Sequence, residues 1–249
     1  MDESALETFL DDLEDGSVRA AMPLDNGEWQ ANTQVKEKIL AVFRAGKLVN
    51  LGDFVDKHNL PMRRFSAEDR IRIVPGGTSI RRGAHLAHNV VVLPPSYVNI
   101  GAYVAEGTLI DSHVLVGSCA QIGKHVHLSA GVQIGGVLEP VGLTPVVIED
   151  EAFLGANAVV VEGIRVGRRA VLAPGVILSR AVPIYDAVNK VILPRGSAVP
   201  AAAVVVPGSR PLRSEFGQAE GLQISCPIIV KYRDEKSNAS LTLEEALRG

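Results

Sequence analysis

The sequence predicts a mainly β protein built around a parallel β-helix, a triangular prism made by a chain that turns after every six residues. Two series of residues support this prediction. An aliphatic residue recurs at every sixth position: Val74, Ile80, Leu86, Val92, Val98, Val104, Ile110, Val116, Ile122, Leu128 and Ile134. Small or β-branched residues follow four positions behind: Thr78, Ala84, Val90, Ser96, Ala102, Thr108, Val114, Ala120, Val126 and Val132. A period of six fits neither an α-helix nor an alternating hairpin strand.

The spacing between the two series predicts where the chain turns. A residue of the second series lies two positions before the next residue of the first, so both share one face of a strand, and the remaining four-residue gap must contain a corner. Three such faces close one coil, and stacked coils pair strand on strand in parallel, about 4.8 Å apart. Repeats of this kind are typical of hexapeptide β-helices.

The repeat is interrupted once and then returns. It resumes at Ile148, Leu154, Val160, Val166, Leu172 and Leu178, with Ala152, Ala158, Ile164, Ala170, Val176 and Val182 as the second series. Fourteen residues separate Ile134 from Ile148, two more than two repeats require. We therefore expect a loop around residues 138–145 to bulge from the prism, either replacing a strand or extending a coil.

Residues 1–69 are predicted to form a separate helical cap domain. Leu6, Leu10 and Leu13 fall at helical spacing, and a second helical pattern over residues 34–48 can stop at Gly46. The polar stretch 23–33, which holds the single tryptophan, is interpreted as a connecting loop. We expect this cap to cover the first coil, whose open edge would otherwise pair with other chains.

Residues 70–208 are predicted to be the β-helix domain and residues 209–249 a small α/β tail. The repeat fails over residues 183–194, returns briefly at Val199 and Val205, and is expected to end at Pro207 and Gly208. In the tail, residues 225–232 have the pattern of a strand, and Thr242 opens a short helical pattern with Thr or Ser as its cap.

Composition narrows the classes of partner. The formal net charge is −3 and the chain has no tract rich in Lys or Arg, which argues against nucleic acid as a partner. The acidic start and the lack of a long apolar run predict no signal peptide, no membrane partner and a cytoplasmic location. The two cysteines are too few for a disulfide framework, and Cys119 is interpreted as a packed small residue rather than a catalytic thiol.

Several stretches resemble the tetrahydrodipicolinate N-succinyltransferase family. They are residues 71–75, 95–104, 106–108, 116–124, 134–140 and 228–234, so the resemblance covers about residues 70–249. It implies a left-handed β-helix and a homotrimer with active sites between subunits. It also implies transfer of a succinyl group from succinyl-CoA to the amino group of ring-opened tetrahydrodipicolinate, a step of diaminopimelate and lysine synthesis.

This chemistry requires a group that handles the proton of the attacking amine. The resemblance implies that Asp111 contacts the amino group of the substrate, so Asp111 is the expected amine-orienting residue and the candidate base. The competing interpretation is a turn former, because the corresponding corner positions hold Gly117, Gly123, Ser129 and Gly135.

Arginines are the candidates for the two carboxylates of the amino dicarboxylate substrate. Arg72 matches a substrate-binding arginine of the family, and a guanidinium can grip a carboxylate with two hydrogen bonds. The competing interpretation of Arg72 is an ordinary surface arginine. Arg81 and Arg82 could serve the second carboxylate, although solvated surface charge is the favoured interpretation of each.

One departure from the family concerns the second carboxylate side chain that the enzyme itself would contribute to catalysis. Some members carry a functional Glu three residues before the Glu-Gly pair that matches Glu162–Gly163, and this sequence has Val159 there. Residues 156–160 resemble instead the related N-acetyltransferases, which keeps acetyl-CoA as an alternative donor. Glu162, contributed from a neighbouring subunit, is the second catalytic candidate, against a solvated corner. Ala105 also stands where an Asp is usual.

Small residues at outer corners would let the pantetheine arm of CoA lie against the backbone. The candidates are Gly135, Gly155 and Ala173, with Arg180, Lys231 or Arg233 as phosphate partners. Glycine also fits tight corners without any ligand.

Histidines keep two further classes of function open. Many hexapeptide acetyltransferases use a histidine base, and trimeric β-helix carbonic anhydrases bind zinc through three histidines. The prism of this chain carries His85, His88, His113, His125 and His127. No spacing identifies a converging set, so no metal is expected, and a zinc hydratase and a non-catalytic β-helical scaffold remain as alternatives.

Overall fold

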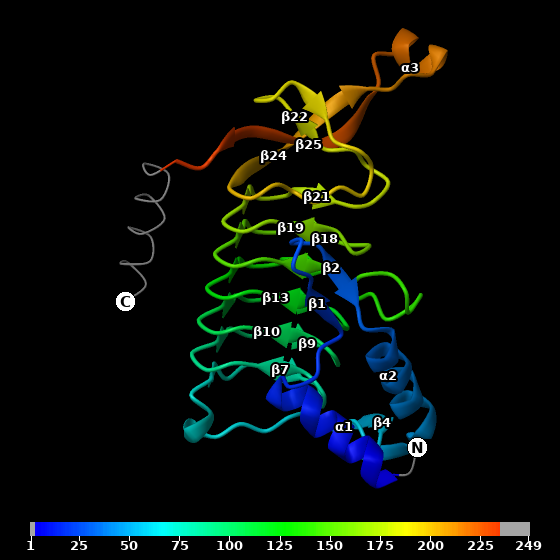
Figure 1. Cartoon of the computed structure of the whole chain (residues 1–249), viewed down its shortest axis with the longest axis vertical. Helices are drawn as coiled ribbons and strands as arrows, with labels where there is room; N and C mark the ends of the chain where they lie inside the picture. The colour runs from blue at the N-terminus through cyan, green and yellow to red at the C-terminus, as the bar shows by residue number, and fades with distance from the viewer. Residues whose placement is uncertain (1–2, 235–249) are drawn as a thin grey trace.

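The computed structural model describes residues 3–234. Figure 1 shows a tall prism of stacked coils, with the N-terminal helices along one side and a hairpin arm beyond the last coil. The hexapeptide period thus builds the β-helix expected from the sequence.

Three parallel sheets form the walls of the prism. The first wall contains β5 (Arg72–Ile73), β8 (Val91–Val92), β11 (Leu109–Ile110), β14 (His127–Leu128), β17 (Phe153–Leu154) and β20 (Val171–Leu172). The second wall contains β6 (Ser79–Ile80), β9 (Tyr97–Val98), β12 (Leu115–Val116), β15 (Gln133–Ile134), β18 (Val159–Val160) and β21 (Ile177–Leu178). The third wall contains β7 (His85–Leu86), β10 (Tyr103–Val104), β13 (Gln121–Ile122), β16 (Val147–Ile148) and β19 (Arg165–Val166).

Strand register shows how the inserted loop is accommodated. Val91 pairs with Leu109 and Leu109 pairs with His127, in steps of 18 residues, whereas His127 pairs with Phe153, a step of 26. The eight additional residues lie between β15 and β16, which are consecutive strands of the prism. The predicted loop around residues 138–145 is therefore confirmed, and it extends one coil without replacing a strand.

The first coil differs from the predicted phase by one residue. Ile73 pairs with Val92, so Ile73 takes the inward place that the period had assigned to Val74. The step from Arg72 to Val91 is 19 residues instead of 18. The turn after β5 contains Gly76 and Gly77, with φ of 144° and 93°, a backbone conformation that favours glycine.

The prism interior is apolar and includes two polar members of the second series. Thr108 is fully buried, and its hydroxyl donates to the Gly123 carbonyl at 2.8 Å and accepts from the Val126 N–H at 3.1 Å. Ser96 bonds in the same way, to the Asp111 carbonyl and the Val114 N–H. Both hydroxyls therefore connect neighbouring coils. Each donates its proton to a carbonyl and accepts from a backbone N–H, so neither hydroxyl is buried without a hydrogen bond.

The N-terminal module, residues 3–69, contains more strand than the sequence predicted. Its elements are α1 (Glu3–Asp15), β1 (Ala21–Pro23), β2 (Trp29–Ala31), α2 (Thr33–Ala45), β3 (Leu48–Leu51), β4 (Phe54–Lys57) and the 3₁₀ turn η1 (Ala67–Asp69). Both predicted helices are confirmed, and Gly46 caps α2. The interpretation of residues 23–33 as a loop is wrong in part, because β2 pairs with β1.

This module covers the third wall as well as the first coils (Figure 1). The Arg19 guanidinium lies 3.7 Å from the Tyr103 ring centroid and donates to the Gln121 side chain at 3.0 Å. Higher on the prism, Arg165 donates to the Gly27 carbonyl. The expectation of a cap on the first coil alone is corrected: outward side chains such as Gln121 are buried beneath the module.

Beyond the last coil the chain forms an arm. Its elements are β22 (Tyr185–Asp186), β23 (Val191–Ile192), β24 (Ala203–Pro211), α3 (Glu215–Ala219) and β25 (Gln223–Tyr232). β24 begins as a strand of the first wall, beside β20, and continues as an antiparallel pair with β25. The predicted tail strand is confirmed.

The repeat was expected to end at Pro207 and Gly208, and pairing with the first wall does stop at Val205, but the strand β24 continues through both residues into the arm. Pro207 lies opposite Pro227 in the arm, where a two-stranded edge tolerates proline. The helical pattern at Thr242 lies outside the described residues. Within residues 3–234, every helix is too short or too polar to cross a bilayer.

Candidate active site

The first corner of the prism, which joins the first wall to the second, collects three of the predicted site residues. The Asp111 N–H donates to Leu128 O, the Ser129 N–H to Leu154 O, and the Gly155 N–H to Leu172 O. Each residue therefore lies directly above its equivalent in the previous coil. Asp111, Gly155 and Ala173 occupy one vertical edge in this way.

Asp111 is half-buried and takes part in its own corner. Its Oδ1 accepts from the Ser112 N–H at 2.7 Å, and its carbonyl accepts from the Ser96 hydroxyl at 2.8 Å. The first bond is what a turn former makes. It engages one carboxylate oxygen, so the turn-forming and the chemical roles of Asp111 are compatible.

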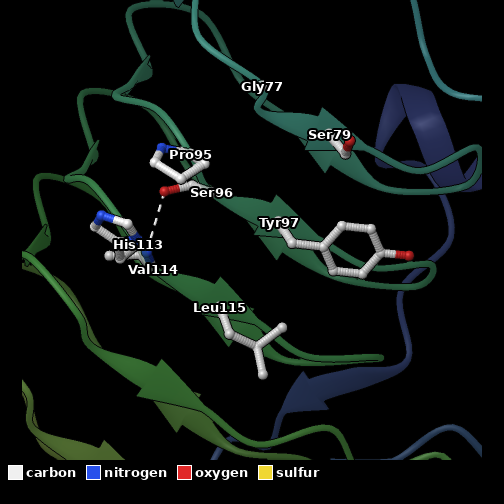
Figure 2. Close-up of a pocket in the computed structure, with 8 residues that line it drawn as sticks. All are labelled: Gly77, Ser79, Pro95, Ser96, Tyr97, His113, Val114 and Leu115. Atoms are coloured by element: carbon white, nitrogen blue, oxygen red, sulfur yellow. Dashed lines mark hydrogen bonds between the residues drawn. The ribbon is translucent and has the colours of Figure 1, made fainter.

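A cavity of about 340 Å³ lies at this corner and on the adjoining second wall. Its lining consists of Gly77, Ser79, Pro95, Ser96, Tyr97, His113, Val114 and Leu115, drawn in Figure 2. Tyr97 and Leu115 project from neighbouring strands, while His113 stands at the corner two residues after Asp111. The volume falls in the range of small-molecule sites.

Sequence reasoning did not assign Ser96, Tyr97 or His113 to the site. His113 carried a usable signal in the sequence, because it is a histidine two residues after the expected base, and the structure shows that it is exposed. Tyr97 had none, since the spacing assigns Tyr97 to a wall but does not show which wall carries the site.

The second corner, which joins the second wall to the third, holds the other candidates. Three of them lie there: Gly135, Glu162 and Arg180. The backbone of Glu162 is left-handed, with φ of 57°. The exposed Glu162 side chain accepts from the Arg180 N–H at 2.9 Å through Oε2. The inserted loop lies against this corner, because a Cβ added to Gly163 would come within 2.2 Å of the Thr144 carbonyl oxygen.

The two catalytic candidates lie apart within one chain. Asp111 follows β11 at the first corner, whereas Glu162 follows β18 at the second, so the width of the second wall separates them. They also differ by two coils, about 10 Å along the prism axis. A single protomer therefore does not bring Asp111 and Glu162 together.

The arginines near the first coil divide into two kinds. Arg72 is exposed on the outward face of the first wall. Arg81, in contrast, donates to Asp56 at 2.7 Å and to the Tyr97 hydroxyl at 3.2 Å. Burial lowers the pKa of Arg81, but its hydrogen bonds with Tyr97 and Asp56 outweigh burial and raise the pKa.

Arg82 is engaged even more fully, with Glu7, Asp11 and Glu14 of α1 within 2.9 Å. The interpretation of Arg81 and Arg82 as solvated surface charge is wrong. Both guanidiniums are mostly buried, and they join the N-terminal module to the prism because β4 and α1 supply the carboxylates that pair with them.

The remaining phosphate candidates lie beyond the coils that hold Asp111. Lys231 is exposed on β25, opposite Val204, at the upper end of the first wall. Arg233 instead donates through Nη1 to the Arg169 carbonyl at 3.0 Å. Lys231 is thus the one of the two whose charge faces solvent.

Cys119 and two of the histidines are packed against other side chains, as residues with a structural role would be. Burial raises the pKa of Cys119 to about 12, so its thiol stays protonated near neutral pH, as a packed residue would. His85 stacks on Tyr103 at 4.4 Å, and His127 stacks on Phe153 at 4.7 Å. In the described part of the chain, no three His, Cys, Asp or Glu side chains are grouped to hold a metal ion.

Comparison with known proteins places this geometry in a family. Residues 2–45 match the model described as tetrahydrodipicolinate N-succinyltransferase N-terminal, and residues 145–180 match the hexapeptide repeat of succinyl-transferase. The first match extends the likeness into the N-terminal module, which lies outside the resemblance described over about residues 70–249.

Curated relatives cover almost the whole chain. The 2,3,4,5-tetrahydropyridine-2,6-dicarboxylate N-succinyltransferases of Afipia carboxidovorans and Polynucleobacter asymbioticus are each 42% identical over 98% of this chain and 89% of the relative. The enzyme of the same name from Xylella fastidiosa strain Temecula1 is 40% identical over 96% of this chain and 86% of the relative.

Among solved structures, a Campylobacter jejuni protein described as a candidate 2,3,4,5-tetrahydropyridine-2-carboxylate N-succinyltransferase superposes with a TM-score of 0.59. The alignment covers 92% of this chain and 63% of that protein at 18% identity, which supports the fold. The left-handed β-helix implied by the sequence resemblance agrees with these matches. With identity above 40% along nearly its entire length, this chain belongs to the tetrahydrodipicolinate N-succinyltransferase family.

Proposed function

We propose that the protein transfers the succinyl group of succinyl-CoA to the amino group of ring-opened tetrahydrodipicolinate, in diaminopimelate and lysine synthesis. One observation carries the proposal: the relatives named for this reaction are 42% identical over 98% of the chain, through the N-terminal module, the prism and the arm. A shared fold alone would not support a substrate.

The reaction assigns separate tasks to Asp111 and Arg72. The amine nitrogen attacks the thioester carbonyl carbon, an N–C bond forms, the C–S bond breaks, and CoA leaves as the thiolate. Asp111 accepts one proton from the ammonium, which frees the amine to attack, or holds the amine toward the thioester. The nitrogen loses a second proton as the amide forms, and this second proton neutralises the thiolate. Arg72, exposed on the first wall, binds a carboxylate of the acceptor.

The role of Glu162 depends on the departure at Val159. Val159 lies on the outward face of β18, so the chain has no carboxylate at the place where some family members carry one. Glu162, three residues later, presents its carboxylate at the second corner instead. We assign Glu162 as the second candidate, contributed to the Asp111 site of a neighbouring subunit.

Small residues at both corners support a path for CoA. At two of these positions, packing against the next coil already requires glycine. A Cβ on Gly135 would meet Val161 at 2.9 Å, and one on Gly155 would meet the Pro174 nitrogen at 2.6 Å. Glycine is thus required by the next coil, with or without a ligand. We propose that the pantetheine arm lies along these corners, with Ala173 beside it and Arg180 or Lys231 near the phosphates.

We propose a homotrimer with active sites between subunits. The third wall is covered by the N-terminal module, whereas the outward side chains of the second wall are mostly apolar: Tyr97, Leu115, Val159 and Ile177. Contact between such walls buries apolar surface, and it can bring Asp111 of one copy near Glu162 of another. Light scattering should then give three times the chain mass of 26.4 kDa, and a fully active monomer would contradict the shared site.

The decisive experiment offers succinyl-CoA and acetyl-CoA, each with tetrahydrodipicolinate or 2-aminopimelate, and follows thiol release. We expect the higher kcat/KM with succinyl-CoA. The likeness of residues 156–160 to N-acetyltransferases supports acetyl-CoA as the second candidate donor, and a preference for acetyl-CoA would establish it. Turnover unchanged by a chelator is expected, since no metal is assigned a role. The cytoplasmic location stays a prediction.

A further inference from the structure

Lys36 is a fully buried lysine in the first turn of α2, with 0% of its surface exposed. Lysine is almost never buried to this extent unless a carboxylate pairs with it. Within residues 3–234, no acidic side chain forms an ion pair with Lys36. Its Nζ donates instead to the backbone carbonyl of Leu143, at 2.5 Å.

That carbonyl belongs to the loop inserted between β15 and β16. Leu138, at one end of the loop, packs against the helices of the N-terminal module, and Leu143 packs against the prism core. Lys36 adds a directional bond between the module and the loop backbone. The loop is thus fixed from the side of α2.

On its other side the loop touches the second corner. The Thr144 carbonyl lies so close to Gly163 that a Cβ there would be 2.2 Å away. Gly163 directly follows Glu162, and Gly135 begins the insertion immediately after β15. The position of the Leu143 carbonyl therefore bears on the residues proposed to hold the acyl donor.

Burial makes Lys36 a costly choice for packing alone. Burial lowers the pKa of Lys36, and the neighbouring Cys119 thiol, with its pKa raised to about 12, stays neutral and supplies no counter-charge. An apolar side chain of the same length would fill the site without desolvating an amine. What lysine provides and an apolar side chain would not is the hydrogen bond from Nζ to the loop backbone.

We propose that Lys36 is a positioning residue, which holds the inserted loop against the second corner so that the loop forms one side of the acyl-donor site. The inference rests on the proposed acyltransferase function and deepens it. It predicts that donor binding, and not acceptor binding, depends on a residue of the N-terminal module.

The test compares Lys36→Met, which keeps the length of the stem and removes Nζ, with Lys38→Met on the same helix. Lys38 is exposed, so it controls for loss of a lysine from α2. We expect Lys36→Met to raise the KM for succinyl-CoA about tenfold, the effect of one charge-assisted hydrogen bond. The KM for the acceptor should change less than about twofold, and Lys38→Met should leave both unchanged.

A second measurement keeps the inference separable from the enzymatic proposal. Hydrogen exchange is measured on the ligand-free protein in whatever oligomeric state it purifies. The amides of residues 135–146 should exchange faster in Lys36→Met than in wild type. Thermal unfolding should show a Tm close to that of wild type, because the lost bond to the Leu143 carbonyl is offset by no longer burying an amine. Unchanged loop exchange overturns the positioning role even if wild type is an active succinyltransferase, whereas an inactive wild type with faster loop exchange in Lys36→Met refutes only the function.

Discussion

Replacing Asp111 with Asn separates the two interpretations of this residue. Asn has the size of Asp and keeps an Oδ1 that can accept from the Ser112 N–H. In the wild-type protein this hydrogen bond joins Ser112 N to Asp111 Oδ1 at 2.7 Å. The corner is therefore preserved, and we expect the free energy of unfolding to change by less than about 1 kcal/mol. What the substitution removes is the carboxylate charge and its basicity.

The two interpretations predict very different rates. Loss of a general base typically lowers kcat by about 10²–10⁴, which corresponds to about 2.7–5.5 kcal/mol of activation free energy. If Asp111 only forms a turn, kcat should stay above about a third of wild type, a loss under about 1 kcal/mol. We expect the larger loss.

The assay is thiol release at saturating succinyl-CoA and acceptor, at several pH values, with CoA binding measured on the same preparation. Asp150→Asn is the matched control, because the Asp150 Oδ1 accepts from the Lys124 N–H at 2.8 Å in a corner on the other side of the prism. Both variants should bind CoA nearly as wild type does. An Asp111→Asn variant that retains more than a third of kcat refutes the base assignment and directs attention to Glu162.

Three other outcomes are expected. Arg72→Ala should raise the KM for the acceptor while leaving CoA affinity and Tm unchanged, because this exposed guanidinium packs against little; equal loss of both affinities would indicate structural damage. Leu154→Ala, at a fully buried prism position, should lower the urea-derived free energy of unfolding by about 2–5 kcal/mol. For Asp186, burial raises the pKa, but hydrogen bonds from Tyr232 and Asn189 outweigh burial and hold the pKa below its ordinary value. The stability that Asp186 contributes should thus be present above about pH 4 and lost as pH falls through the lowered pKa, and Asp186→Asn should lack this part of the acid transition.

Local spacing accounts for most of what could be predicted. Each coil returns to the same wall after 18 residues, so a one-dimensional period in the sequence maps directly onto strand pairs such as Val91 with Leu109. The same logic failed at Val74, because one extra residue in the Gly76–Gly77 turn shifts the phase and leaves no trace in an aliphatic pattern. The helices of the N-terminal module were equally readable from the spacing of their apolar residues.

The candidate site was predictable residue by residue but not as an arrangement. Asp111 and Glu162 each stand in a corner that the period identifies, yet the period does not show which corners of two different subunits would meet. His113 and Tyr97 join the cavity because consecutive coils stack them there. Arg81 and Arg82 instead form ion pairs with carboxylates of the N-terminal module, which the hexapeptide period does not reveal.

The sequence by itself determined the repeating prism, its interruption near residues 138–145 and the family resemblance, because these depend on residues close together along the chain. Only the tertiary structure decided that the N-terminal module lies along the third wall, that β24 leaves the prism to pair with β25, and that Lys36 reaches Leu143. The physical reason is that these features join surfaces more than a hundred residues apart, or strands whose partner is chosen by available edges, and burial of an amine such as Lys36 exists only once both surfaces have met.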